Sequence, residues 1–129
     1  MSTRTKLLIF GESAECDAAA ETIGTMPELS GRDCKYYHTD DLENIDKVLV
    51  DISPALLVVI ADGAKGMECV YRAREHNSEL PVFWFSDDKA FAVQSYRFNC
   101  AYFAEKPVTA DKLDRAIKRC SHMGIQIFK

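Results

Sequence analysis

The sequence predicts an α/β fold: one doubly wound parallel sheet of five strands with helices on both faces. Short apolar runs and helix-like segments alternate five times along the 129 residues. Strand–helix repeats with short connections build parallel sheets that helices cover on both sides. No linker, internal repeat or low-complexity segment interrupts the alternation. At this length we expect one domain, spanning residues 1–129, with a substantial buried core.

The first half of the chain contains three of the expected strands. Lys6–Phe10 is a short apolar run that ends at a glycine, which is typical of a buried parallel strand. Glu12–Gly24 follows as a helix with its apolar residues on one side. Cys34–His38 is partly polar, so we place this strand near the sheet edge. Ala55–Ala61 is the most apolar segment and should form the central strand.

The remaining elements follow the same alternation. Thr39–Asp41 can cap a helix whose apolar residues recur from Leu42 to Ile52, before Ser53-Pro54 ends it. In the second half of the chain we expect two more strands, at Pro81–Phe85 and Cys100–Ala104. The expected helices are Gly66–Asn77, the short Lys89–Phe98 and a final helix capped by Thr109. The chain then ends in an apolar tail with Ile125, Ile127 and Phe128.

Charge and cysteine usage narrow the classes of function. A net charge of −4 argues against binding to nucleic acid or to an anionic membrane, because both need a concentrated basic face. The five cysteines include no CxxC pair, so we expect small buried residues in a reducing compartment, without disulfides or zinc. No signal peptide or long apolar run is present, and we therefore expect a cytoplasmic protein.

Polar residues stand at the ends of several strands. Ser86 follows the expected fourth strand, and Lys106 follows the fifth, directly before a proline. The carboxyl ends of parallel strands meet at one edge of the sheet, where open α/β sheets place their chemistry. The first strand ends in Gly11 and Glu12, and the third ends in Ile60-Ala61-Asp62. All these residues should therefore line one pocket.

One pattern in the second half of the chain consists of Gly66-Met67-Glu68, Arg72, Arg74-Glu75 and Asn77, then Phe91-Ala92, Tyr96, Phe98–Ala101, Phe103 and Lys106-Pro107. With this pattern the chain resembles a response-regulator receiver domain, which has the flavodoxin-like (CheY-like) fold, and it is most similar to receivers that precede LytTR-type DNA-binding domains. The resemblance covers essentially the whole chain. It implies a module of two-component phosphorelay signalling.

The resemblance also implies roles for individual residues. In a receiver, an acidic pair after the first strand holds Mg²⁺, and an aspartate that ends the third strand accepts the phosphoryl group. A Ser or Thr and a Lys then bind the phosphoryl oxygens. Ser86 and Lys106 match these last two roles. Phe103 matches the aromatic residue that changes rotamer on activation.

The sequence departs from this pattern at the two acidic positions. Gly11-Glu12 keeps only one carboxylate of the pair. Counted from Pro54, the acceptor position falls on Ile60, which has neither a nucleophile nor a metal ligand. The loop before Gly66 is also shorter than in the family and lacks its Met-Pro turn. The residue pattern therefore predicts a degenerate phosphorylation pocket.

Two alternatives stay open for Asp62. A shift of two residues along a strand keeps the same facing, so Asp62 could face the pocket as a remnant acceptor or cation ligand. Asp-Gly is also a common turn, and Asp62 precedes Gly63.

Because burying an unpaired ammonium is costly, we further expect Lys106 to pair with Glu12 or Asp62. That pair would replace the phosphoryl group as the counter-charge of the pocket.

The leading functional expectation is a non-enzymatic pseudo-receiver that acts through protein contact, without conventional aspartyl phosphorylation and without a cofactor. The alternative is a receiver that is phosphorylated on Asp62, with Mg²⁺ held by Glu12. A third class, a small nucleotide-binding or hydrolytic enzyme, lacks support because no GxGxxG, P-loop or Ser-His-Asp arrangement is present.

The expected partner is another protein or a second copy of the chain. In receivers, the fourth helix, the fifth strand and the fifth helix together form the usual contact and dimerisation face. Tyr96, Phe98 and Phe103 are the candidate residues of this face, with core packing as the alternative for each. We expect this chain to contact neither nucleic acid nor membrane.

Overall fold

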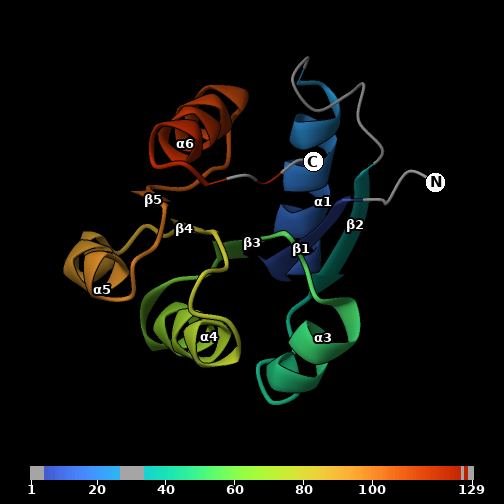
Figure 1. The fold of residues 1–129 in the computed structure, drawn as a ribbon, viewed down its shortest axis with the longest axis vertical. Coiled ribbons are helices and arrows are strands. Elements are labelled where there is room, and N and C mark those ends of the chain that lie inside the picture. The colour runs from blue at the N-terminus through green and yellow to red at the C-terminus, as the bar shows by residue number, and fades with distance from the viewer. Residues whose placement is uncertain (1–4, 27–33, 126, 128–129) are drawn as a thin grey trace.

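The computed structural model describes residues 5–26, 34–125 and 127. Five parallel strands form one sheet in the order β2-β1-β3-β4-β5. The strands are β1 (Thr5–Gly11), β2 (Cys34–Thr39), β3 (Leu56–Ile60), β4 (Val82–Phe85) and β5 (Tyr102–Ala104). The order runs outward in both directions from β1 and β3, as in a doubly wound sheet (Figure 1). The predicted fold class is confirmed.

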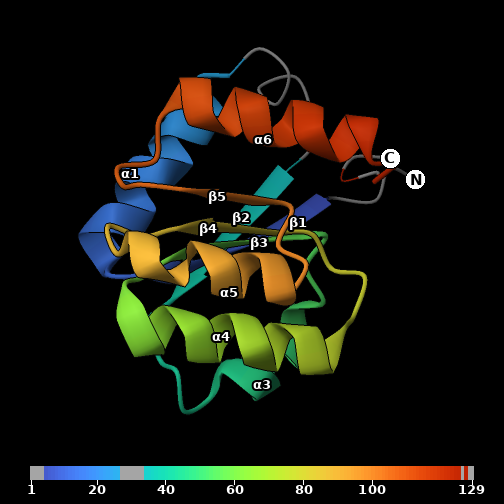
Figure 2. The ribbon, with the colours of Figure 1, turned by 90° about the vertical axis from the view of Figure 1, so that its left-hand side faces the viewer.

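Helices lie on both faces of this sheet. They are α1 (Ser13–Gly24), α3 (Ile45–Ile52), α4 (Gly63–His76), the 3-10 turn η1 (Lys89–Phe91), α5 (Ala92–Arg97) and α6 (Ala110–His122). Figure 2 shows α1 and α6 on one face and α3, α4 and α5 on the other. None of the helices in the described part of the chain combines the length and the apolar character that crossing a bilayer requires.

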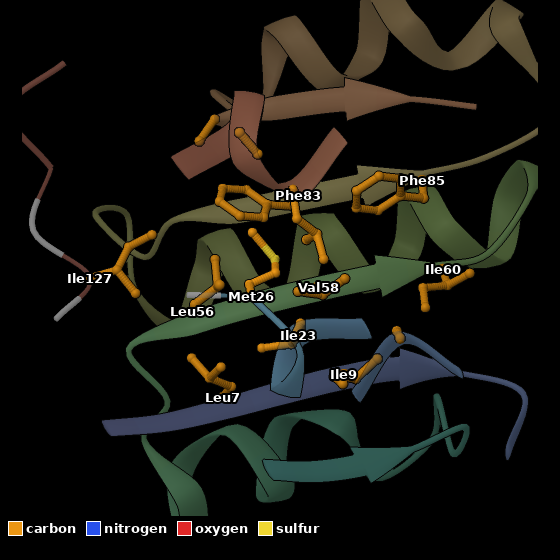
Figure 3. Packing of buried hydrophobic residues seen from close by; sticks show 14 of the residues in the cluster. Leu7, Ile9, Ile23, Met26, Leu56, Val58, Ile60, Phe83, Phe85 and Ile127 are labelled. Atoms are coloured by element: carbon orange, nitrogen blue, oxygen red, sulfur yellow. The ribbon is translucent and has the colours of Figure 1, made fainter. Parts of the chain in front are cut away.

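The first half of the core lies between the sheet and helices α1 and α6. Figure 3 shows Val58 and Phe83 from the sheet together with Ile23 from α1. Ile127 of the C-terminal tail packs near Leu56, at the amino end of the strands, and is only 6% exposed. The prediction of an apolar, packed tail is therefore confirmed for this residue, and Ile125 packs against the same cluster. Phe128 lies outside the described residues.

The other half of the core lies between the sheet and helices α3 and α4. Successive residues of a strand point to opposite faces, so Leu8, Phe10 and Val59 pack here while their neighbours pack on the first face. Trp84 is fully buried in this half. Both faces of the central strands are thus apolar, and each fully buried large side chain stabilises the fold by about 1.5–3 kcal/mol.

Several element boundaries differ from the prediction by a few residues, among them the starts of helices α4 and α3. Helix α4 begins at Gly63, before the predicted Gly66, because Gly63 has a φ of +59° and turns the chain directly after the strand. Helix α3 begins at Ile45, later than Leu42, because the carboxylate of Asp41 accepts hydrogen bonds from the backbone and side-chain amides of Asn44, at 3.3 and 2.6 Å.

The cysteines behave as small packing residues. No disulfide joins the five cysteines, all of which lie in the described part of the chain, and Cys16, Cys69 and Cys120 are buried. Burial raises the pKa of the Cys16 thiol to about 11 and that of Cys100 to about 12. These thiols therefore stay protonated and unreactive near neutral pH.

Candidate functional site

Three side chains meet at the carboxyl edge of the sheet, where Asp62, Ser86 and Lys106 follow β3, β4 and β5. Lys106 Nζ donates a hydrogen bond to Asp62 Oδ2 at 3.0 Å. Ser86 Oγ donates to Asp62 Oδ1 at 3.1 Å, and the backbone N–H of Asp87 donates to the same oxygen at 2.7 Å. Both oxygens of one carboxylate thus accept hydrogen bonds from the serine and the lysine of the predicted pocket.

The local backbone explains why Asp62 faces these residues. Asp62 is the residue before helix α4, with an extended backbone (φ −90°, ψ 157°), and its side chain accepts no hydrogen bond from its own helix. Instead, the carboxylate reaches across to the ends of β4 and β5. Of the two alternatives for Asp62, the contacts match the pocket-facing orientation.

Charge and hydrogen bonding reinforce each other at this pair. The Asp87 N–H and then the Lys106 ammonium hold the pKa of Asp62 below its usual value. The hydrogen bond to Asp62 raises the pKa of Lys106, although partial burial opposes the rise. The expected pair between Lys106 and a carboxylate is therefore present. The Lys106 side chain is 19% exposed and that of Asp62 is 48% exposed, so water screens the pair in part.

A second carboxylate, which the sequence analysis missed, reaches the same lysine. Glu15 Oε2 in the first turn of α1 lies 3.6 Å from Lys106 Nζ. Glu12 was one of the two predicted partners, but among the described residues only Asp62 and Glu15 form ion pairs with Lys106. Residues three apart lie on the same side of a helix, so the spacing between Glu12 and Glu15 could have indicated that Glu15 also faces the pocket.

A cavity of about 110 Å³ opens beside this pair. It brings together most of the predicted pocket residues and adds Lys65, whose ammonium lies 5.7 Å from the centre of the Phe10 ring. The lining residues are Gly11, Glu12, Glu15, Ile60, Ala61, Asp62, Lys65 and Lys106. Ser86 is fully buried next to them. The residues predicted to share one pocket therefore lie together at this edge of the sheet.

Ile60, which the sequence analysis matched to the acceptor position of receivers, has no nucleophile. Ile60 is only 3% exposed and its side chain packs in the first half of the core. It lies opposite Gly11 in the register of β1 and β3. No side chain on either residue can attack a phosphoryl donor or ligate a cation.

The residues of the pocket do not fit the Mg²⁺ site of a receiver. Gly11 offers no carboxylate, and the carboxylates of Asp62 and Glu15 already form ion pairs with the Lys106 ammonium. Within the described ranges, no three acidic, histidine or cysteine side chains are grouped to hold a metal ion. A cation needs several oxygen ligands, and this pocket does not offer the full set.

The Ser86 hydroxyl takes part in two hydrogen bonds. Besides donating to Asp62, it accepts the backbone N–H of Asp88 at 3.0 Å. Asp88 in turn caps η1 through the N–H of Ala90 at 3.1 Å. The hydroxyl therefore links the pocket carboxylate to the start of the following helix.

The three residues of the predicted partner face differ in exposure and in their contacts. Tyr96 on α5 is 82% exposed. Phe98 is half-buried and its ring stands 6.0 Å from Tyr71 of α4. Phe103 is half-buried against Trp84, with ring centres 5.4 Å apart. Phe98 and Phe103 therefore pack against the second half of the core, and Tyr96 alone of the three presents a free ring.

Comparison with protein-family models and with curated protein sequences gave no match. Solved structures match over nearly the whole chain. A response-regulator receiver domain from Clostridium thermocellum has a TM-score of 0.71 and 16% identity, covering 93% of this chain and 96% of its own. The signal receiver domain of a modulated diguanylate cyclase from Desulfovibrio desulfuricans has a TM-score of 0.67 and 25% identity, covering 94% and 96%.

A solved structure whose name does not mention a receiver also has this fold. A putative CpaE2 pilus assembly protein from Sinorhizobium meliloti has a TM-score of 0.70 and 16% identity, covering 90% of this chain and 99% of its own. At such identities the likeness establishes the architecture. The chain has the fold of response-regulator receiver domains.

Proposed function

We propose that this chain is a signalling module of the two-component type: a pseudo-receiver that acts through protein contact and without conventional aspartyl phosphorylation. The observation that carries the proposal is the carboxylate of Asp62. Its two oxygens accept hydrogen bonds from Ser86 and Lys106, the residues that would bind a phosphoryl group in a receiver. We further propose that the module is non-enzymatic and cytoplasmic.

The charges of the pocket support this reading. A phosphoryl group brings negative charge and acceptor oxygens to a hydroxyl and an ammonium. Here Asp62 supplies both from within the chain, and Glu15 adds a second negative charge 3.6 Å from Lys106. The groups that would respond to phosphorylation are therefore satisfied by the folded chain itself. The state of the pocket is then set by folding and partner binding.

A second candidate function rests on the same carboxylate. Asp62 is 48% exposed and stands within 3.1 Å of both Ser86 Oγ and Lys106 Nζ, as an accepting aspartate would. Glu12 lines the same cavity. These observations favour a receiver phosphorylated on Asp62. In this reading alone Mg²⁺ would be a cofactor, with Glu12 and Asp62 as ligands, a set that lacks the carboxylate missing at Gly11.

Intact-protein mass spectrometry after incubation with acetyl phosphate and Mg²⁺ separates the two candidates. The pseudo-receiver is expected to gain no phosphoryl group. A stoichiometric gain that disappears in Asp62→Asn would overturn the proposal in favour of the second candidate. Asp87→Asn is the matched control, because Asp87 contributes its backbone N–H and not its carboxylate to the contact with Asp62. A gain that both variants retain marks modification elsewhere and leaves Asp62 without an acceptor role.

The proposed output is contact with a protein partner or a second copy of the chain through α5, β5 and α6. Tyr96 and Val93, on one side of α5, are 82% and 59% exposed. Exposed aromatic residues are enriched at the centres of protein interfaces.

The pattern from Phe98 to Ala101 supports kinship with receivers of LytTR-type regulators, although this chain itself is expected to contact no nucleic acid.

A further inference from the structure

The only tryptophan of the chain connects the pocket to helix α5. Trp84 is fully buried in β4, and its indole Nε1–H donates a hydrogen bond to the backbone oxygen of Ala61 at 2.9 Å. Ala61 directly precedes Asp62 and lines the same cavity. The indole therefore holds the backbone immediately before the carboxylate that pairs with Lys106.

This hydrogen bond fixes the orientation of a rigid unit. The carbonyl of Ala61 and the amide of Asp62 belong to one planar peptide group, so holding the carbonyl also fixes the direction in which the chain enters Asp62. The N–H of Ala61 is held as well, by the backbone oxygen of Phe85 at 3.2 Å. Both sides of the residue before Asp62 are thus fixed by β4.

Helix α4 is shaped to accommodate the same hydrogen bond. A Cβ added at Gly66 would stand 2.4 Å from the Ala61 oxygen and 2.8 Å from Trp84 Nε1. No side chain fits at this position, and the first turn of α4 closes over the bond. A hydrogen bond in such a buried setting is strong, and leaving either partner unpaired is correspondingly costly.

The indole ring also contacts two elements beyond the pocket. The ring of Phe103 in β5 stands 5.4 Å away at an interplanar angle of 88°. The ring of Phe91 stands 5.9 Å away at 58°. Phe91 is the residue before helix α5, which carries the exposed Tyr96. Trp84 therefore contacts the strand that leads to Lys106 and the start of α5.

We infer that Trp84 is a positioning residue that couples the Asp62–Lys106 pair to the orientation of helix α5. When the pair is broken, the peptide group between Ala61 and Asp62 loses one of its constraints and rotates. The indole N–H then loses its acceptor, and because an unpaired buried donor is costly, the ring moves to recover one. Phe91 follows the ring, and α5 moves with it. The inference rests on the proposed function, for which it supplies the route from pocket to partner-binding helix.

The test uses the single indole N–H resonance in the ¹H–¹⁵N NMR spectrum of the full chain. In Lys106→Met and in Asp62→Asn, this resonance is expected to shift by several line widths, together with the backbone amides of Val93 and Tyr96. Asp111→Asn is the control, since its carboxylate pairs with Arg115 on the exposed side of α6 and should leave the indole unmoved. An indole resonance that stays in place in both pocket variants overturns the inference.

A second variant separates coupling from simple core packing. Trp84→Phe keeps an aromatic ring but removes the N–H donor. In this background, Lys106→Met should no longer shift the amides of Val93 and Tyr96. If these shifts persist at full size, the coupling does not pass through the indole. Should Trp84→Phe fail to fold, the indole resonance of the two pocket variants decides alone. None of these measurements involves phosphoryl transfer, so phosphorylated Asp62 would overturn the proposed function without touching this result.

Discussion

Gly11 of β1 lies so close to Ile60 of β3 that a side chain does not fit at position 11. A Cβ added there would stand 2.8 Å from the backbone oxygen of Ile60 and 3.2 Å from its Cβ. Under the proposed pseudo-receiver function, these two positions correspond to one carboxylate of the acidic pair and to the phosphoryl acceptor. Here the two losses belong to one packing arrangement. An acid at position 11 cannot be restored without moving the end of β3.

Replacing Gly11 by Ala should therefore destabilise the fold by about 1–3 kcal/mol, the usual cost of overpacking a well-packed site. Urea unfolding monitored by tryptophan fluorescence measures the change. The matched control is Gly24→Ala at the end of α1, where nothing lies within 4 Å of the added Cβ. That variant should be neutral or slightly stabilising. Equal effects of the two substitutions would contradict the close approach at Gly11.

The ion pair between Lys106 and Asp62 should contribute modestly to stability. A double-mutant cycle with Lys106→Met and Asp62→Asn is expected to give a coupling free energy of about 0.5–1 kcal/mol, because Asp62 is 48% exposed. The coupling should weaken in high salt. The pair of Asp111 and Arg115, with side chains 80% and 68% exposed, is the reference and should show almost none. Coupling of the reference pair as strong as that of the pocket would refute a special role for Lys106.

The same pair predicts a pH dependence with a definite sign. The pKa of Asp62 is lowered in the fold, so its contribution is present above the unfolded value of about 4 and is lost as pH falls through the lowered pKa. The pKa of Lys106 is raised, so its contribution is present below about 10.4 and is lost as pH rises through the raised value. The pair is therefore fully effective across the neutral range.

Unfolding free energies measured between neutral and acidic pH check the acid side. The difference between the wild-type chain and Asp62→Asn should shrink as pH falls below about 4, since the carboxylate is then protonated in the unfolded chain and increasingly in the folded one. A difference that stays constant down to strongly acidic pH would mean that the Asp62 charge is not what stabilises the pocket.

The sequence was sufficient for the sheet and for most of the pocket, for a topological reason. The strands are continuous apolar runs such as Leu56–Ile60, and parallel strands bring their carboxyl ends to one edge. Ser86, Lys106 and Asp62 follow such ends directly, so their meeting could be inferred without knowing any side-chain direction. Whether the Asp62 carboxylate would face the pocket or its own turn depended on the backbone at Gly63, and there two alternatives stayed open.

The residues that were missed depend on how helices and rings are oriented. Glu15 and Lys65 lie in the first turns of α1 and α4, and whether such residues reach the cavity depends on the rotation of each helix about its axis. The start of α4 was missed because the residues at Gly63 show no apolar period. Phe103 packs against Trp84, and spacing along the chain could not decide between this core packing and a place on the partner face.

Tyr96 offers the last prediction, on the partner face. Because its side chain is 82% exposed, Tyr96→Ser should change the free energy of unfolding by no more than about 0.5 kcal/mol. It should nevertheless weaken self-association in sedimentation velocity, if a second copy of the chain is the partner. Val50→Ser on α3, where the side chain is 65% exposed, is the matched control and should leave association unchanged. An equal loss in both variants would point to nonspecific apolar contact, and a chain that is monomeric at every concentration would leave a different protein as the partner.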